Sequence, residues 1–288
     1  MAALAVALVA VLIVLVSSGG GGNGGGGGGS GSAKPAAATA TKPARTHQQA
    51  PRLVSPHRSP IPILMYHVIG DPGPGQPNVS LFVSGPEFQA QMDWLAKHGY
   101  HGITLQQAYD YWRHAVAVPR KPVVVSFDDG YLGQYTHGFP VLQRLRWPGV
   151  LNLKLGNVGK GGIEKSEVKK LVAAGWEIDS HTITHPDLRL VGAAQLHTEV
   201  FQSKTRLRRL FGVPANFFCY PSGQFDAAAV AAVKAAGYLG ATTTVPGFAS
   251  PKEGIFTLDR LRIDRGDGAA GLATKLASRG SGIGTTGE

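Results

Sequence analysis

The stretch Val123–Tyr131 constrains this chain more than any other, because two adjacent acidic residues directly follow an apolar run. The three valines at 123–125 predict a buried strand of a parallel sheet, and Pro122 fits its first position, where no ladder N–H is needed. Gly130 permits a sharp turn after it. Asp128 and Asp129 are therefore expected at the C-terminal end of a strand, where α/β enzymes carry their chemistry. Two carboxylates there repel each other unless a cation or a proton lies between them. The alternative to a functional site is that the two aspartates belong to an ordinary solvated turn after the strand.

A pair of histidines, His181 and His185, follows a second predicted strand at residues 176–179. Neutral imidazoles and a carboxylate are ligands that a Zn²⁺-like ion accepts, with water in the remaining position. The spacing differs from the zincin helix motif, because Thr182 stands where that motif needs Glu and Pro186 follows at once. An isolated His-x-x-x-His is commonly coincidental. Joined to the two aspartates, it predicts an Asp–His–His metal site.

The two motifs carry a family resemblance. Ser126–Tyr131 followed by Ser180–His185 resembles the first two motifs of the NodB-homology polysaccharide deacetylases, or carbohydrate esterase family 4. The resemblance extends over residues 60–279, which we therefore expect to form the polysaccharide deacetylase domain. It implies an α/β fold, a distorted (β/α) barrel of about seven strands, fewer than in the eight-stranded form.

The resemblance also assigns roles to the aspartates and histidines. It implies a divalent metal held by Asp129, His181 and His185, with Asp128 as general base. Zn²⁺ is the first choice, and the ligand set also admits Co²⁺, Ni²⁺ or Mn²⁺.

The predicted strand 61–67 ends in a histidine, His67, which by composition alone is an ordinary strand-end residue. One branch of the family, resembling the poly-β-1,6-N-acetylglucosamine deacetylases, begins its domain with a Met/Cys-Tyr-His strand. In that circularly permuted branch this histidine replaces the late Leu-x-His motif of other members. The late strand 258–264 of this chain contains no histidine. The resemblance to the permuted branch therefore assigns His67 as general acid.

The strand and turn at residues 217–223 resemble the third family motif, Arg-x-Pro-Tyr-Gly, with two departures. Cys219 stands in place of the arginine that pairs with the base, and Ser222 in place of the aromatic residue. The permuted branch also lacks that arginine. The backbone N–H of Ser222 can still serve as an oxyanion donor, because it does not depend on the side chain. Tyr131 and Pro221 are assigned with it to the substrate side of the site.

The N-terminal region differs in composition from the rest. Residues 2–16 are unbroken apolar, which is short for a membrane span and typical of a signal-peptide core, although no basic residue precedes them. We assign 1–18 as a signal peptide or membrane anchor. Residues 19–59 are rich in Gly, Ala and Pro and predict a disordered linker, and 280–288 a flexible tail. The protein is expected to be secreted or anchored outside the cell.

The charge of the chain is concentrated in this linker. The formal net charge is +10, and no acidic residue precedes Asp71. Five basic residues lie in the linker: Lys34, Lys42, Arg45, Arg52 and Arg58. Such an arm suits an anionic cell-envelope surface. Nucleic acid is not an expected partner, because the basic residues are not interleaved with aromatic ones. The single cysteine excludes an internal disulfide.

Strand-like and helix-like segments alternate through the rest of the chain, which predicts βα units. The predicted helices lie between Ser84 and Gly99, and at about 105–114, 134–144, 166–174, 193–210, 227–236 and 272–278.

The resemblance implies metal-dependent hydrolysis of acetamide groups in an extracellular polysaccharide that contains N-acetylglucosamine, with release of acetate. Two alternatives remain open. The first is an O-acetyl esterase acting on acetylated polysaccharide. The second is a catalytically inactive sugar-binding module, against which the intact set Asp128, Asp129, His181 and His185 argues.

Overall fold

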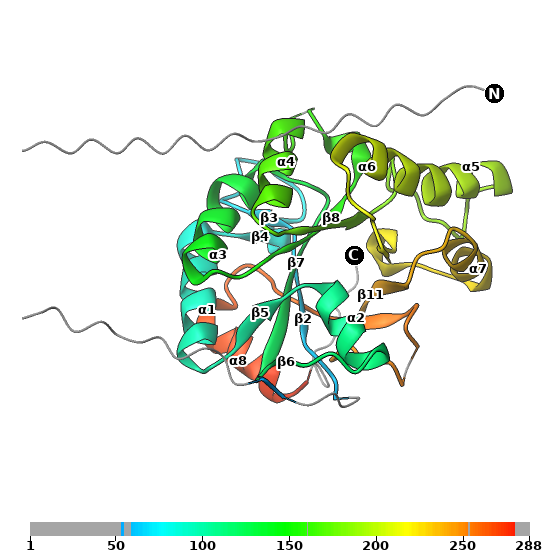
Figure 1. Ribbon diagram of the computed structural model, residues 1–288. Coiled ribbons are helices and arrows are strands. Elements are labelled where there is room, and N and C mark those ends of the chain that lie inside the picture. The colour runs from blue at the N-terminus through cyan, green and yellow to red at the C-terminus, as the bar shows by residue number, and fades with distance from the viewer. Residues whose placement is uncertain (1–52, 55–58, 160, 253, 280–288) are drawn as a thin grey trace, which may run out of the picture. The chain divides into compact units, whose positions relative to one another are not determined.

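The computed structural model describes residues 53–54, 59–159, 161–252 and 254–279, and a closed parallel β-barrel forms the core of this part of the chain (Figure 1). Within these residues seven strands make the barrel, in the order β2-β12-β11-β10-β9-β8-β7, and β7 pairs with β2 to close it. The strands are β2 (Ile63–Tyr66), β7 (Pro122–Asp128), β8 (Val150–Leu153), β9 (Glu177–Ser180), β10 (Phe217–Cys219), β11 (Gly240–Pro246) and β12 (Leu258–Arg262). The predicted fold class is confirmed.

Five short strands of the described residues lie outside the closed ring. β5 (His101–Ile103) runs parallel to the first half of β7. β3 (Val68–Ile69) pairs with β4 (Phe82–Val83), and β1 (Leu53–Val54) pairs with β6 (Val118–Pro119). β1 falls in the stretch that composition assigned to the linker. The predicted leader 1–18, nearly all of the linker 19–59 and the tail 280–288 lie outside the described residues.

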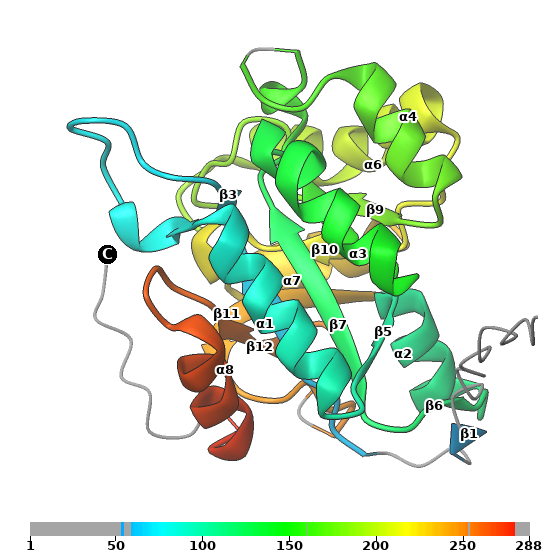
Figure 2. The same ribbon diagram turned by 90° about the vertical axis from the view of Figure 1, so that its left-hand side faces the viewer.

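Helices surround the barrel, and α1, α3 and α4 cover one side of it (Figure 2). The α-helices are α1 (Gly85–Lys97), α2 (Leu105–Arg113), α3 (Phe139–Leu145), α4 (Lys165–Ala173), α5 (Ala193–His197), α6 (Ser203–Phe211), α7 (Ala227–Ala235) and α8 (Gly268–Ala277). Two π-helical turns, η2 (Gln134–Gly138) and η4 (Thr198–Gln202), lead into α3 and α6. Three 3₁₀ turns are η1 (Val79–Leu81), η3 (Leu155–Asn157) and η5 (Pro221–Gly223). Of the helices within the described ranges, none has the length and hydropathy to cross a bilayer.

Local sequence explains where several helices begin. The Ser84 side chain accepts a hydrogen bond from the Glu87 N–H at 3.3 Å, which caps α1. Thr104 and Gln107 form a reciprocal capping box at the start of α2. The helix predicted at 134–144 is observed as η2 followed by α3, and the one predicted at 193–210 as α5, η4 and α6.

The alternation of side chains along β7 places the functional residues inside the barrel. Val123, Val125 and Phe127 pack in the apolar cluster that contains residues of α1, α3 and α4. Val124 instead packs in the cluster with Ile63, Val150, Phe217 and Leu258 of other barrel strands. Successive side chains of a strand point to opposite faces, so Ser126 and Asp128 share the inner face with Val124. The barrel is therefore apolar at one end and polar at the other, where the strands end.

Candidate active site

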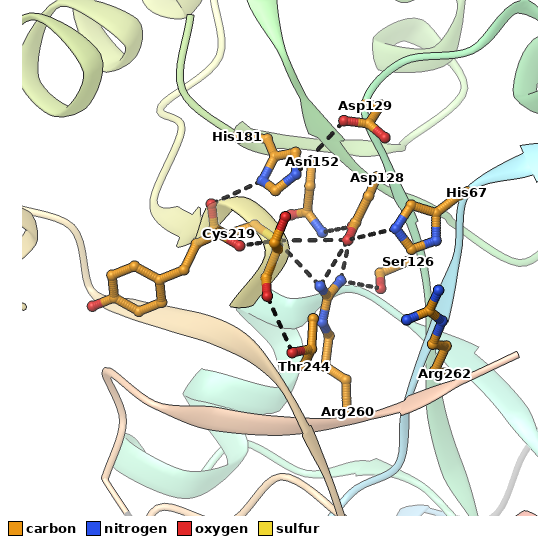
Figure 3. Close-up of polar contacts among 12 residues, drawn as sticks. His67, Ser126, Asp128, Asp129, Asn152, His181, Cys219, Thr244, Arg260 and Arg262 are labelled. Atoms are coloured by element: carbon orange, nitrogen blue, oxygen red, sulfur yellow. Dashed lines mark hydrogen bonds and ion pairs between the residues drawn. The ribbon is translucent and has the colours of Figure 1, made fainter. Parts of the chain in front are cut away.

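The candidate site lies where β7, β9, β10 and β12 bring polar side chains together (Figure 3). Asp128 is the last residue of β7, and Asp129 follows it in a left-handed conformation with φ 76°. The Asp129 N–H donates to the Asn152 carbonyl oxygen of β8 at 3.0 Å, which fixes the turn. The bend after β7 thus separates the two adjacent carboxylates.

Asp129, His181 and His185 converge as a candidate metal-binding triad. The Oδ1 of Asp129 is 3.7 Å from Nε2 of His181 and 3.9 Å from Nε2 of His185. The three ligand atoms all lie within 4.8 Å of one another. Ligand atoms around a tetrahedral ion at about 2.0–2.2 Å are roughly 3 to 4 Å apart, so the spacing and the donor types fit a zinc-like ion.

Hydrogen bonding sets the orientation of His181. Its Nδ1–H donates to the backbone carbonyl of Cys219 at 2.8 Å, so the neutral ring keeps the lone pair on Nε2, toward Asp129. A ligand histidine held in this way is the usual arrangement at metal centres. The side chain of residue 219 takes no part in this contact, since the acceptor is the main chain.

The two imidazoles titrate differently without a cation. Burial and the neighbouring His181 lower the pKa of His185 to about 4, so this ring is neutral. Burial also acts to lower the pKa of His181, but Cys219, Asp128 and Asp129 outweigh it and raise the pKa to about 10. A cation between the rings and Asp129 would take the place of the proton on His181.

Asp128 belongs to a different group of contacts, in which Arg260 of β12 is the main partner. Nη1 and Nη2 of Arg260 donate to Oδ1 and Oδ2 of Asp128 at 2.8 and 2.7 Å, and the two side chains are 0% and 2% exposed. Asn152 adds a hydrogen bond to Oδ1 at 2.8 Å. Burial alone would raise the pKa of Asp128, but the Arg260 charge and hydrogen bonds hold it well below its ordinary value.

Sequence reasoning missed Arg260. A signal was present, because Arg260 lies between Leu258 and Leu261 in a buried strand, and arginine is almost never fully buried without a partner. The identity of that partner could not be inferred, since Asp128 lies 132 positions earlier.

Cys219 touches both members of this pair. Its Sγ is 3.3 Å from Nη2 of Arg260 and 3.7 Å from Oδ2 of Asp128. This is the position at which the resembled motif carries an arginine. The small thiol of Cys219 leaves room for the guanidinium of Arg260 from β12. The absence of the motif arginine at position 219 is therefore matched by a buried arginine from another strand.

His67 follows β2 and lies on the other side of Asp128. Its Nε2 is 3.9 Å from Oδ2 of Asp128. Burial lowers the pKa of His67, Asp128 and Asp129 oppose this, and Arg260 and Arg262 add to the lowering. Its Nδ1 is buried and has no hydrogen-bond partner among the described residues.

A buried glutamine on η2 joins the two strand ends. Nε2 of Gln134 donates to the carbonyl oxygens of His67 at 2.7 Å and of Asp128 at 2.6 Å. Tyr66 and Phe127 are the last paired residues of the β2–β7 ladder. The carbonyl groups of His67 and Asp128 therefore lie one residue beyond the end of that ladder. An amide NH₂ carries two N–H groups, and both are used here. Gln134 was not singled out from the sequence.

The three residues assigned to the substrate side lie in different surroundings. Burial, together with the charge and hydrogen bonding of Asp129, raises the pKa of Tyr131 to about 12, so this phenol is neutral beside the triad. Ser222 is exposed on η5 with φ 48°, and Pro221 before it is buried. Within the part of the chain described here, no hydrogen bond or ion pair joins Ser222 to Asp129, His181 or His185. Its assignment stays a prediction.

Comparison with known proteins gives a consistent result. A family model described as "Polysaccharide deacetylase" matches residues 115–241. The protein YxkH of Bacillus subtilis (strain 168), whose name places it among the polysaccharide deacetylases, is 30% identical over 219 residues, 76% of each chain. A poly-β-1,6-N-acetyl-D-glucosamine N-deacetylase of Staphylococcus aureus (strain MRSA252) is 25% identical over 170 residues, 54% of this chain and 58% of that one. The structure of the Streptococcus pyogenes deacetylase PplD in complex with acetate superposes with a TM-score of 0.70 at 25% identity, over 78% and 99% of the chains.

Proposed function

This chain belongs to the polysaccharide deacetylase family, and from that premise we propose that it is a metal-dependent N-deacetylase of an extracellular N-acetylglucosamine polymer. One observation carries the proposal. Asp129 converges with His181 and His185, while the adjacent Asp128 is paired with Arg260 by two hydrogen bonds, although it also lies within 4.8 Å of His181. Two neighbouring carboxylates thus have separate environments and are suited to separate roles, one as a ligand and one as a base.

Asp129, His181 and His185 would hold the metal, with Zn²⁺ as first choice and Co²⁺, Ni²⁺ or Mn²⁺ as other candidates. When bound, a divalent ion supplies Lewis-acid polarisation of the acetamide carbonyl and lowers the pKa of a water. Three protein donors are typical of catalytic zinc sites, in which water or substrate takes the fourth position.

The remaining steps belong to the side chains around Asp128. Its carboxylate accepts the proton of the attacking water, and Nε2 of His67, 3.9 Å away, donates a proton to the departing amine nitrogen. The Ser222 N–H and the neutral Tyr131 hydroxyl are assigned to the oxyanion and the substrate. The C–N bond of the acetamide is cleaved, and acetate and a free amino sugar are the products.

The names of the relatives support a substrate class. The matched Staphylococcus aureus protein is named for poly-β-1,6-N-acetyl-D-glucosamine, and Met65-Tyr66-His67 resembles the permuted branch to which that activity belongs. We therefore place β-1,6-linked N-acetylglucosamine first among the candidate polymers. The apolar leader and the basic linker support an extracellular setting, with the linker against an anionic envelope surface.

The proposal is tested by acetate release from β-1,6 and β-1,4 N-acetylglucosamine oligomers, peptidoglycan and acetylxylan, with chelated and metal-loaded protein. We expect release from the β-1,6 oligomers that requires the metal. Asp129→Ala should lose metal and activity together, whereas Asp128→Asn should keep the metal and lose turnover. Release from acetylxylan alone would make the protein an O-acetyl esterase, and binding of oligomers with no acetate from any substrate or metal would make it a sugar-binding module.

A further inference from the structure

Glu199 is a buried carboxylate whose partners all lie in the loop between the two candidate metal-binding histidines. It is 2% exposed and lies on η4. Its Oε2 accepts the backbone N–H groups of Ile183 and Thr184 at 2.7 and 3.0 Å, and its Oε1 accepts the Thr184 hydroxyl at 2.5 Å. Three bonds thus tie one side chain to two consecutive residues of a five-residue segment.

That segment has an unfavourable backbone conformation. Thr182 and His185 have φ values of 65° and 66°, in the left-handed region, which is unusual for a β-branched residue such as threonine. Such conformations persist where the surroundings impose them. The Thr182 hydroxyl accepts the His185 N–H at 3.0 Å inside the loop. From outside, the Leu155 and Gly156 N–H groups donate to the carbonyl oxygens of Thr182 and Ile183, and Glu199 is the side chain that accepts the Ile183 and Thr184 N–H groups.

The contacts of Glu199 suit a carboxylate that accepts hydrogen bonds. Two of its three partners are backbone N–H groups, which can only donate, and hydrogen bonds to a charged acceptor are the strong ones. No lysine, arginine or histidine of the described ranges lies within ion-pair distance of it. A buried negative charge without a cationic side chain is costly, and a cation held by the same loop would compensate it.

We infer that Glu199 is a positioning residue for the metal site. It holds the backbone of Ile183 and Thr184 so that the imidazoles of His181 and His185 face Asp129 together. Its carboxylate also adds a negative charge beyond the ligands. Mutation of side chains that orient metal ligands typically lowers metal affinity by about 10- to 100-fold. A π-helical turn such as η4 is a frequent feature of functional sites. The inference rests on the proposed metal site.

The test measures Zn²⁺ and Co²⁺ affinity of the whole protein, and the visible absorption of the Co²⁺ form. Glu199→Ala removes all three contacts, and we expect metal binding weaker by about 10- to 100-fold, with a changed Co²⁺ spectrum at saturation. Glu199→Gln keeps an oxygen for both N–H groups, while its NH₂ can donate to the Thr184 hydroxyl. It removes only the charge, so we expect a smaller loss and an unchanged spectrum.

Two further variants keep the test decisive. Thr184→Val removes one of the three contacts and leaves Glu199 in place, and we expect this variant to bind metal more weakly than the wild type. It therefore tests the inference independently if Glu199→Ala fails to fold. Gln91→Ala is the matched control, because Gln91 is equally buried and hydrogen-bonded on α1, so its loss should leave metal affinity unchanged. Wild-type affinity and spectrum in folded Glu199→Ala or Thr184→Val would overturn the inference. Absence of metal binding in the wild type would instead overturn the proposed function.

Discussion

Arg260 of β12 holds Asp128 of β7 by two parallel hydrogen bonds, of 2.8 and 2.7 Å, although β2 lies between their strands. Removing one partner of a buried ion pair leaves an uncompensated charge and costs about 3–5 kcal/mol. We expect a loss of that size in the free energy of unfolding for Arg260→Met. The double variant Arg260→Met/Asp128→Asn should be more stable than the sum of the single losses implies. The free energy of unfolding in urea is measured for the wild type, the two single variants and the double variant. If the losses of the two single variants add up to that of the double variant, Asp128 and Arg260 are not energetically coupled.

The same pair predicts how stability depends on pH. The folded-state pKa of Asp128 lies well below the ordinary 3.8, so the unfolded chain takes up this proton first as the pH falls. The stabilisation is therefore fully present above about pH 5 and declines as the pH drops below the ordinary value. The difference in unfolding free energy between wild type and Asp128→Asn should shrink as the pH falls below about 4. A difference that grows toward low pH would contradict the assignment.

The charge environment of His67 predicts the pH dependence of turnover. A general acid acts in its protonated form, so kcat/KM should fall as the pH rises through the pKa of His67, which burial and the arginines lower. Arg262→Gln removes one of the lowering charges and should move this limb to higher pH by about a few tenths of a pH unit. Arg265→Gln is the control, because Arg265 pairs with Asp71 and is not among the charges that act on His67. A profile that is unchanged in Arg262→Gln would remove His67 from this role.

The sequence allowed the barrel and the triad to be predicted because their signals are local. The valines before Asp128 and the short strand before His181 each identify a strand end without knowledge of its neighbours. Parallel strands of one sheet end on the same side, so residues from two such ends can be expected to meet. The structure brings ligand atoms of Asp129 and both histidines to within 4.8 Å of one another.

Arg260, Gln134 and Glu199 were not predicted, because their roles depend on distant partners. Periodicity shows that Arg260 faces a buried side, but it does not show which carboxylate arrives there. Gln134 and Glu199 lie on π-helical turns within stretches that predict ordinary helices, and each contacts the backbone of another segment. Backbone N–H and C=O groups are nearly the same in every residue type, so no pattern in the sequence shows which of them a side chain will contact.

Gln134 offers a test of how the strand ends are held. Gln134→Leu leaves the buried carbonyls of His67 and Asp128 without their donor, at a cost of about 1–3 kcal/mol for each unsatisfied group. We expect lower stability and a lower kcat, because the two side chains lose their fixed separation, with zinc affinity unchanged. Gln134→Glu should be worse, since its carboxylate would face two carbonyl oxygens. If Gln134→Leu retained full turnover, the two hydrogen bonds of Gln134 would contribute to stability alone.

The contact between Cys219 and Arg260 predicts that the guanidinium can be supplied from either strand. Cys219→Arg alone should destabilise strongly, because a second guanidinium would be forced into a filled, fully buried position. Arg260→Met alone should lose turnover. In Cys219→Arg/Arg260→Met the new arginine can occupy the vacated space and pair with Asp128, so we expect turnover at least about tenfold above that of Arg260→Met, or about 1.4 kcal/mol of regained transition-state stabilisation.

The control for this exchange is Cys219→Leu/Arg260→Met, which fills space without restoring charge. Because the thiol and the guanidinium lie 3.3 Å apart, a gain from packing alone would appear in both double variants, whereas a gain from pairing with Asp128 requires the arginine. Acetate release from β-1,6 N-acetylglucosamine oligomers, measured beside unfolding by urea, separates the two effects. Equal turnover in the two double variants would mean that Asp128 needs no cationic partner, and Arg260 would then act only in packing.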